Sequence, residues 1–214
     1  MATGTGAGWN RREFVGAAGL LAIALGLPGC VSASAGAADL AAALPPEEAP
    51  NDRQLAMLRE VSQIVIPATD TPGAGDAEVG AFVAMALAHG MEASRAPLPP
   101  AAQTFASTRF LRADGSLRYV DWLDDVLGAG FLEEAPPARL EKVRALDAAA
   151  YAQNAGAHPW RKVKALILLG YYTSEIGGSQ ELQYAPLPGR FDPAVPVQPG
   201  ERAYSNEWTG VEFG

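Results

Sequence analysis

Apolar residues recur through most of the chain at the three- and four-residue spacing of amphipathic α-helices. Leu55, Leu58 and Val61, for example, share one stripe of a segment that begins after Asn51 and that Pro67 closes. No run of alternating β-branched residues predicts a sheet. The expected helices lie at residues 52–66, 78–89, 99–111, 121–127, 136–151 and 159–176. The pattern predicts an all-α fold of about six helices in one compact domain.

The last of these segments is apolar on every side. Residues 165–172 are all apolar or aromatic apart from Gly170, a pattern typical of a helix that is buried all round. Gly177 and Gly178 follow, and glycine is the residue best able to close a helix. We therefore expect this helix to be fully buried.

The first turn of the same helix is basic, with Arg161, Lys162 and Lys164. The helix dipole disfavours positive charge at this end by about a few tenths of a kcal/mol for each residue. An acidic partner is therefore expected opposite. The acidic clusters at 121–125 and 133–134 are the expected partners, in an internal salt bridge.

After Gly178 the composition changes. Residues 179–214 are rich in proline and aromatic residues and show neither helical nor strand periodicity. A structureless segment of this length is unusual inside a compact domain, and disordered tails are usually poor in aromatics. Two interpretations remain, packing on the chain's own domain or binding along a partner. The aromatic composition favours an extended tail that binds a partner.

The N-terminal region has the order of an export signal. Arg11 and Arg12 are followed by Phe14 and by an apolar stretch at 15–27, which resembles a twin-arginine leader. That stretch is shorter than the roughly 20 apolar residues that a membrane-spanning helix needs. We expect export to the periplasm by the twin-arginine route.

Two processing endings fit this leader. Cys30 stands at the end of a sequence similar to a lipoprotein box, although Pro28 is unusual in that motif. Residues 33–37 offer ordinary small-x-small cleavage sites, so Cys30 is either acylated or removed. The expected organisation is a leader at 1–37, a linker at 38–50, a helical domain at 51–178 and an extended tail at 179–214.

Charge and composition exclude several classes of function. The chain has 16 basic and 24 acidic residues and a net charge of -8, which argues against a nucleic-acid-binding protein. One Cys and two His are too few for a structural zinc site, an iron–sulfur cluster or a c-type haem attachment site. We therefore expect no metal or cofactor in this chain.

Catalytic motifs are mostly absent. The chain has no nucleophile elbow and no P-loop. Residues 70–76 faintly resemble a calcium loop, but Pro72 and Ala74 stand where oxygen ligands should be, and a tight turn with an aspartate as helix cap explains them better. His158 could be a general base, with acids such as Asp70, Asp124 or Glu175, but a structural role is favoured because no nucleophile is placed to use it.

Three sequence segments together resemble a known protein family. Residues 66–76 read IPATDTPGAGD, residues 170–177 read GYYTSEIG, and residues 180–184 read QELQY with PGR following at 188–190. These strings resemble the gluconate 2-dehydrogenase subunit 3 family, over roughly residues 52–205. The resemblance implies a small, non-catalytic subunit of a periplasmic flavin-dependent sugar, sugar-acid or polyol dehydrogenase.

The resemblance also implies partners. FAD would lie in a separate large subunit of the glucose–methanol–choline oxidoreductase type, and electrons would pass to a multi-haem cytochrome c subunit. The small subunit would carry the twin-arginine signal for the large subunit and act as its export escort and stabiliser. The residues expected to contact a partner are Tyr171, Tyr172, Glu175, Gln180, Glu181, Tyr184, Arg190, Phe191, Tyr204 and Trp208. A free-standing periplasmic lipoprotein that binds or scaffolds something else is the alternative.

Overall fold

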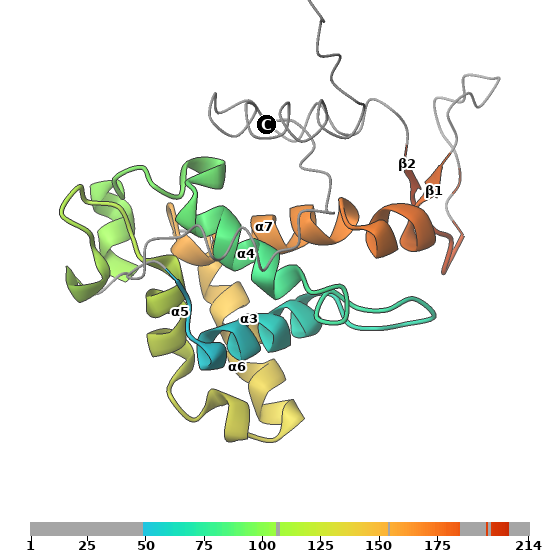
Figure 1. The fold of residues 1–214 in the computed structure, drawn as a ribbon, viewed down its shortest axis with the longest axis horizontal. Coiled ribbons are helices and arrows are strands. Elements are labelled where there is room, and N and C mark those ends of the chain that lie inside the picture. The colour runs from blue at the N-terminus through green and yellow to red at the C-terminus, as the bar shows by residue number, and fades with distance from the viewer. Residues whose placement is uncertain (1–48, 106–107, 154, 185–195, 197, 206–214) are drawn as a thin grey trace, which may run out of the picture.

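The fold is all-α in the part of the chain that the computed structural model describes, residues 49–105, 108–153, 155–184, 196 and 198–205 (Figure 1). The α-helices are α3 (Asp52–Val65), α4 (Val79–Ala88), α5 (Tyr119–Leu127), α6 (Pro136–Ala150) and α7 (Pro159–Tyr172). Short 3-10 helices connect them, η1 (Met91–Ala93), η2 (Pro100–Phe105), η3 (Thr108–Phe110) and η4 (Phe131–Glu133). A π-helix, η5 (Gly177–Glu181), follows α7, and two-residue strands β1 (Gln183–Tyr184) and β2 (Tyr204–Ser205) pair in parallel. The predicted all-α class is confirmed.

Five of the six expected segments are α-helices, and the third is not. Residues 99–111 contain the 3-10 helices η2 and η3 instead. Ser and Thr are frequent in this segment, and their side chains compete for backbone hydrogen bonds. Gln103 also bonds to the backbone here, since its side chain donates to the carbonyl of Leu98 at 3.1 Å.

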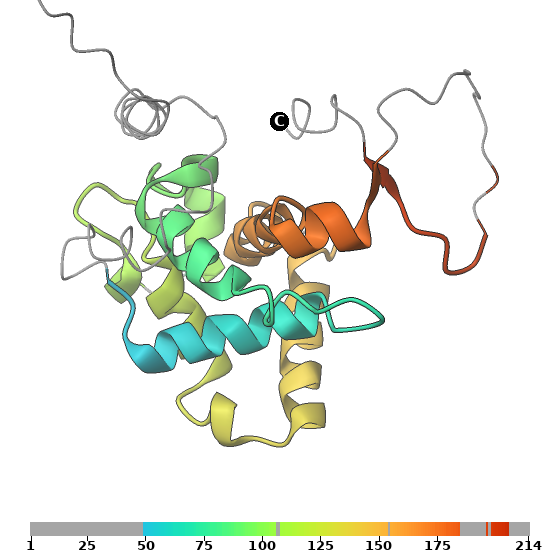
Figure 2. The same cartoon turned by 45° about the vertical axis from the view of Figure 1, so that its right-hand side comes forward.

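The centre of the molecule is a close packing of α3, α4 and α7 (Figure 2). A Cβ atom at Gly80 would lie 2.6 Å from the backbone nitrogen of Arg59 on α3. A Cβ atom at Gly170 would lie 2.5 Å from Cδ1 of Phe82 on α4. Position 80 therefore requires glycine, since the atom met there is backbone, whereas a side chain at position 170 would force the Phe82 ring to move. Two glycines thus let three helices approach more closely than any larger residue would allow.

The large side chains of the core come from every α-helix and from the short helix η4. The largest of those that are almost completely buried are Trp122, Trp160, Tyr171, Phe131, Met57, Leu58, Leu117 and Leu123.

The expectation that α7 is buried all round is wrong. Ala165, Leu168 and Tyr172, which we call the α7 stripe, are exposed on its outer side. Leu168 is 38% exposed and Tyr172 is 42% exposed, whereas Leu166 and Ile167 are fully buried. The helix lies at the edge of the bundle, and its outer residues are apolar although no part of the described domain covers them.

Candidate functional site: a junction at the end of α7

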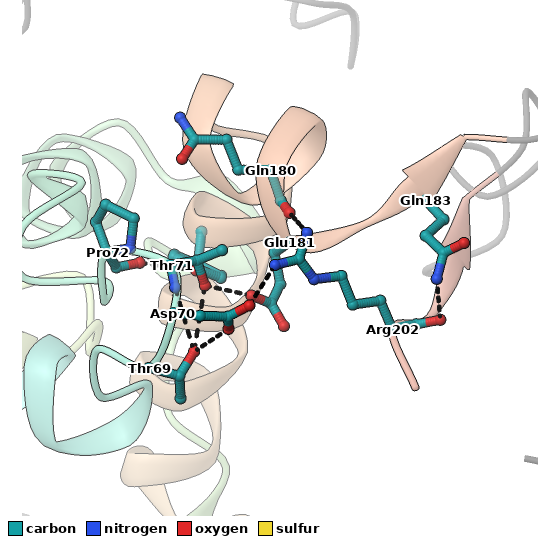
Figure 3. A network of polar contacts seen from close by, with 9 residues as sticks. Thr69, Asp70, Thr71, Pro72, Gln180, Glu181, Gln183 and Arg202 are labelled. Carbon is teal, nitrogen blue, oxygen red and sulfur yellow. Dashed lines mark hydrogen bonds and ion pairs between the residues drawn. The ribbon is translucent and has the colours of Figure 1, made fainter. Parts of the chain in front are cut away.

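Three segments singled out from the sequence meet at the C-terminal end of α7 (Figure 3). We call this place the junction and define it as residues 69–72, 171–172, 180–184 and 202. The hydroxyl group of Tyr171 donates to the carbonyl of Pro72 at 2.9 Å. The hydroxyl group of Thr71 donates to the carboxylate of Glu181. The loop after α3, the end of α7 and the π-helix are therefore joined by side-chain hydrogen bonds.

Gln63 of α3 shapes the loop that enters the junction. Its Oε1 atom accepts from the backbone nitrogen of Gly75 at 2.8 Å, and its Nε2 atom donates to Asp76 at 3.0 Å. A Cβ atom at Gly73 would lie 2.7 Å from the backbone nitrogen of Ala68, and one at Gly75 would lie 2.8 Å from the carbonyl oxygen of Arg59. Both glycines are therefore needed for the loop to fold over α3.

The loop is a turn, as expected, but its aspartate does not cap a helix. Glu78 is the N-cap residue of α4 and makes no side-chain capping bond. Asp76 instead bonds to Gln63 and to the backbone nitrogen of Gly73. Among the described residues no cluster of three or more His, Cys, Asp or Glu could hold a metal ion.

The end of α7 passes into the π-helix through Ser174 and Gly177. The Ser174 hydroxyl donates to the Tyr171 carbonyl at 2.7 Å, and the Gly177 nitrogen donates to the Ser174 hydroxyl oxygen at 3.0 Å. A Cβ atom at Gly177 would lie only 1.9 Å from the Tyr171 carbonyl oxygen. Gly177 is thus required here, although α7 itself already ends at Tyr172.

Arg202 returns the C-terminal segment to the domain. Its Nη2 atom is 2.5 Å from an Asp70 carboxylate oxygen, and its Nη1 atom donates to the Gln180 carbonyl at 2.7 Å. The Gln183 nitrogen donates to the Ala203 carbonyl at 2.8 Å, beside the β1–β2 pairing. Within the described parts of the expected tail, Glu181 and Arg202 therefore contact the chain's own domain.

Neighbouring groups shift the pKa values of two ionisable residues at the junction, Asp70 and Tyr172. The hydrogen bond from Arg202, with a second from Thr69, lowers the pKa of Asp70. Burial raises the pKa of Tyr172, and the nearby Glu181 carboxylate raises it further. At neutral pH Asp70 is therefore ionised and Tyr172 is neutral.

The two adjacent tyrosines of α7 differ in burial. Tyr171 is 1% exposed and belongs to the core, whereas Tyr172 lies on the surface with its ring 5.3 Å from that of Tyr171. Glu175, Gln180 and Tyr204 are exposed.

The remaining expected contact residues are placed less fully. Glu181 is half-buried, and Tyr184 contributes its backbone to β1. Arg190, Phe191 and Trp208 lie outside the described residues, as do the leader residues Arg11, Arg12, Phe14 and Cys30.

His158 caps the opposite end of α7. Its Nδ1 atom accepts from the backbone nitrogen of Trp160 at 3.2 Å, and its ring is buried. Burial lowers the pKa of His158, and the Arg161 cation lowers it further. Asp70 and Glu175 lie at the other end of this 14-residue helix, about 20 Å away by the helical rise. The structure therefore keeps Asp70 and Glu175 away from His158, and the Asp124 carboxylate is paired with Arg53.

The basic first turn of α7 pairs within the domain, but with other partners than expected. Lys164 is 2.8 Å from Asp147 of α6, which also accepts from the indole nitrogen of Trp160 at 2.7 Å. Lys162 donates to the Glu92 carbonyl. The acidic residues at 121–125 pair instead with arginines. Asp124 contacts Arg53, Asp125 contacts Arg109, and Asp121 contacts Arg118.

No helix in the described ranges is long and apolar enough to cross a membrane.

A family model described as gluconate 2-dehydrogenase subunit 3 matches residues 52–189. Neither a curated protein nor a solved structure matches the chain significantly. The matched range contains the whole junction except Arg202.

Replacing Arg202 with Gln should loosen the C-terminal segment without unfolding the domain. The variant loses the ion pair with Asp70, which is exposed and therefore contributes little to global stability. Hydrogen–deuterium exchange should become faster at residues 202–205 and 183–184 and stay unchanged in α3 and α4. Arg144→Gln, which removes an exposed pair with Glu141, is the control. Unchanged exchange in Arg202→Gln would show that this contact does not hold the segment.

Stability should fall as the pH drops below the ordinary histidine pKa of 6.5. The pKa of His158 is lower in the folded chain than in the unfolded chain, so the unfolded chain binds more protons in this window and stability is lost. Urea unfolding at pH 7.5 and pH 5.5 measures the difference. His158→Asn keeps a capping oxygen and should reduce that difference. The control is His89→Asn, which should leave the stability difference between the two pH values unchanged. The assignment to His158 is wrong if His158→Asn keeps the full difference.

Proposed function

This chain belongs to the gluconate 2-dehydrogenase subunit 3 family, and we propose that it is the non-catalytic small subunit of a periplasmic dehydrogenase complex. Its partner in this proposal is a large flavin-containing subunit of the glucose–methanol–choline type, which oxidises a sugar, a sugar acid or a glycoside. The small subunit assembles with that subunit, stabilises it and directs its export by the twin-arginine route. FAD belongs to the large subunit, and a multi-haem cytochrome c subunit is the proposed electron acceptor.

The observation that carries the proposal is the uncovered α7 stripe, which ends at the junction. Leu168 and Tyr172 are large apolar side chains exposed one turn apart on α7. Tyr204, which is 60% exposed, lies in the strand that β1 pairs with. Aromatic side chains at the centre of an apolar patch dominate the binding energy of protein interfaces. The polar groups of the junction suit the rim of such an interface.

The use of the acidic and basic side chains supports a binding role. Asp70 bonds to Arg202, Asp147 bonds to Trp160 and Lys164, and the His158 ring nitrogen caps α7. Each of these groups therefore has a structural partner. The oxidation chemistry accordingly belongs to the large subunit, and this chain holds and delivers that subunit.

Export of the large subunit should depend on the leader of this chain. Co-expression with Arg11→Lys and Arg12→Lys together should leave both subunits in the cytoplasm, because the leader is proposed to serve both. Cell fractionation with antibodies to each subunit measures the outcome, and Arg144→Lys in α6 is the control. Normal export of the large subunit would refute the escort role. A colourless chain purified alone from the native host would instead favour the free-standing lipoprotein.

Replacing Tyr172 with Ala should weaken assembly. Loss of a central aromatic contact typically costs enough to lower affinity about tenfold or more. Co-purification of the large subunit through a tag on this chain measures the effect, with circular dichroism to confirm that the helices remain. Tyr151→Ala removes another exposed tyrosine, which is 53% exposed and contacts Arg161, and should retain the partner. Equal recovery from both variants would exclude the α7 stripe as the interface.

A further inference from the structure

The outer sides of α4 and α7 form a surface without charge. Neither residues 79–88 nor residues 165–172 include a charged side chain, although both helices are partly exposed. On α4 the residues Ala81, Phe82 and Met85 are only half-buried. We call these three residues together with the α7 stripe the α4–α7 face.

The two helices adjoin along their length, as Figures 1 and 2 show. Gly170 of α7 meets Phe82 and Val79 of α4 at one end. At the other end Lys162 donates to the Glu92 carbonyl, just beyond α4. An uncharged surface of this kind is stabilised when it is removed from water. Something that is itself apolar would therefore suit it.

The described chain begins beside α4, at a pocket that none of the six face residues lines. Ala49 and Pro50 line a shallow pocket together with Ala84, Leu87 and Ala88 of α4. Ala49, the first described residue, therefore lies next to α4. About 20 residues, 28–48, separate this point from the apolar stretch at 15–27, and they can span up to about 70 Å. The α7 helix is only about 20 Å long, so the apolar stretch can reach any part of the face.

We propose that, before assembly, residues 15–27 of the leader lie on the α4–α7 face of the same chain. The stretch contains 13 uncharged residues, enough to cover about 20 Å as a helix. Its glycines and alanines permit a close approach to α4 and α7. Because the two parts belong to one chain, their effective concentration is in the millimolar range, about the regime in which weak docking is populated. A second copy of the chain has no such advantage.

This inference rests on the proposed function in taking residues 1–37 as a leader. It adds regulation at the same surface. While residues 15–27 occupy the face, the α7 stripe is shielded and the adjacent twin arginines are held near the domain. The large subunit binds the same stripe and displaces the leader, so the export signal is released when the complex forms.

Photo-crosslinking of the full chain tests the docking directly. The chain is produced alone in the cytoplasm of a host without twin-arginine transport, with benzoylphenylalanine in place of Tyr172. The matched control places the same amino acid at Tyr151, which is also exposed and lies beside Arg161 near the start of α7. Cleavage after glutamate releases residues 14–47 as one peptide, and mass spectrometry identifies its adducts.

The expected result is an adduct within one chain between position 172 and the peptide 14–47, and little from position 151. Leu21→Lys, which puts a charge into the apolar stretch without adding a site for cleavage after glutamate, should reduce that adduct about tenfold. The probe at Leu168 repeats the measurement if the chain with the probe at 172 does not fold. Adducts between two copies, equal adducts from positions 151 and 172, or no leader adduct from either stripe position would each overturn the inference. Since no large subunit is present, these outcomes are independent of whether the complex forms.

Discussion

The hydrogen bond from the Tyr171 hydroxyl group to the Pro72 carbonyl is the contact on which the arrangement of the junction depends. It joins a core residue of α7 to a loop that follows α3, across 99 positions of the chain. A buried hydroxyl group without a partner would cost about 1–3 kcal/mol, so the bond fixes where the loop lies. With the loop in place, Thr71 reaches Glu181 and Asp70 reaches Arg202.

The glycines that let the helices approach also explain why the α7 stripe is exposed. Gly80 brings α4 against α3, and Gly170 brings α7 against α4. These contacts turn Leu166 and Ile167 toward the core. Leu168 must then point outward, because a residue one or two positions further along a helix faces another side. Tyr172, four positions after Leu168, lies on the same side as Leu168. The exposed stripe follows from the helix packing and from an apolar outer side that the domain does not need.

The sequence predicts the helices well where a stripe is regular and where Pro or Gly marks the ends. The strings at 66–76, 170–177 and 180–184, which carry the family resemblance, meet at the junction, but the sequence alone does not predict that contact. It fails for α7, because an apolar run looks the same whether a helix is buried by its own domain or exposed for another surface. It fails for Lys164 as well, since pairing with Asp147 depends on how α6 crosses α7.

The junction and the α7 stripe differ in the free energy that they can contribute to binding. The Arg202 contact with Asp70 is exposed to solvent, and exposed ion pairs contribute little free energy. Breaking this ion pair alone therefore costs little free energy. Apolar side chains such as Leu168 and Tyr172 release about 25 cal/mol for each Å² removed from water. In the proposed complex, a partner that covers the stripe would gain this free energy, and the exposed polar contacts of the junction beside it could rearrange around that partner.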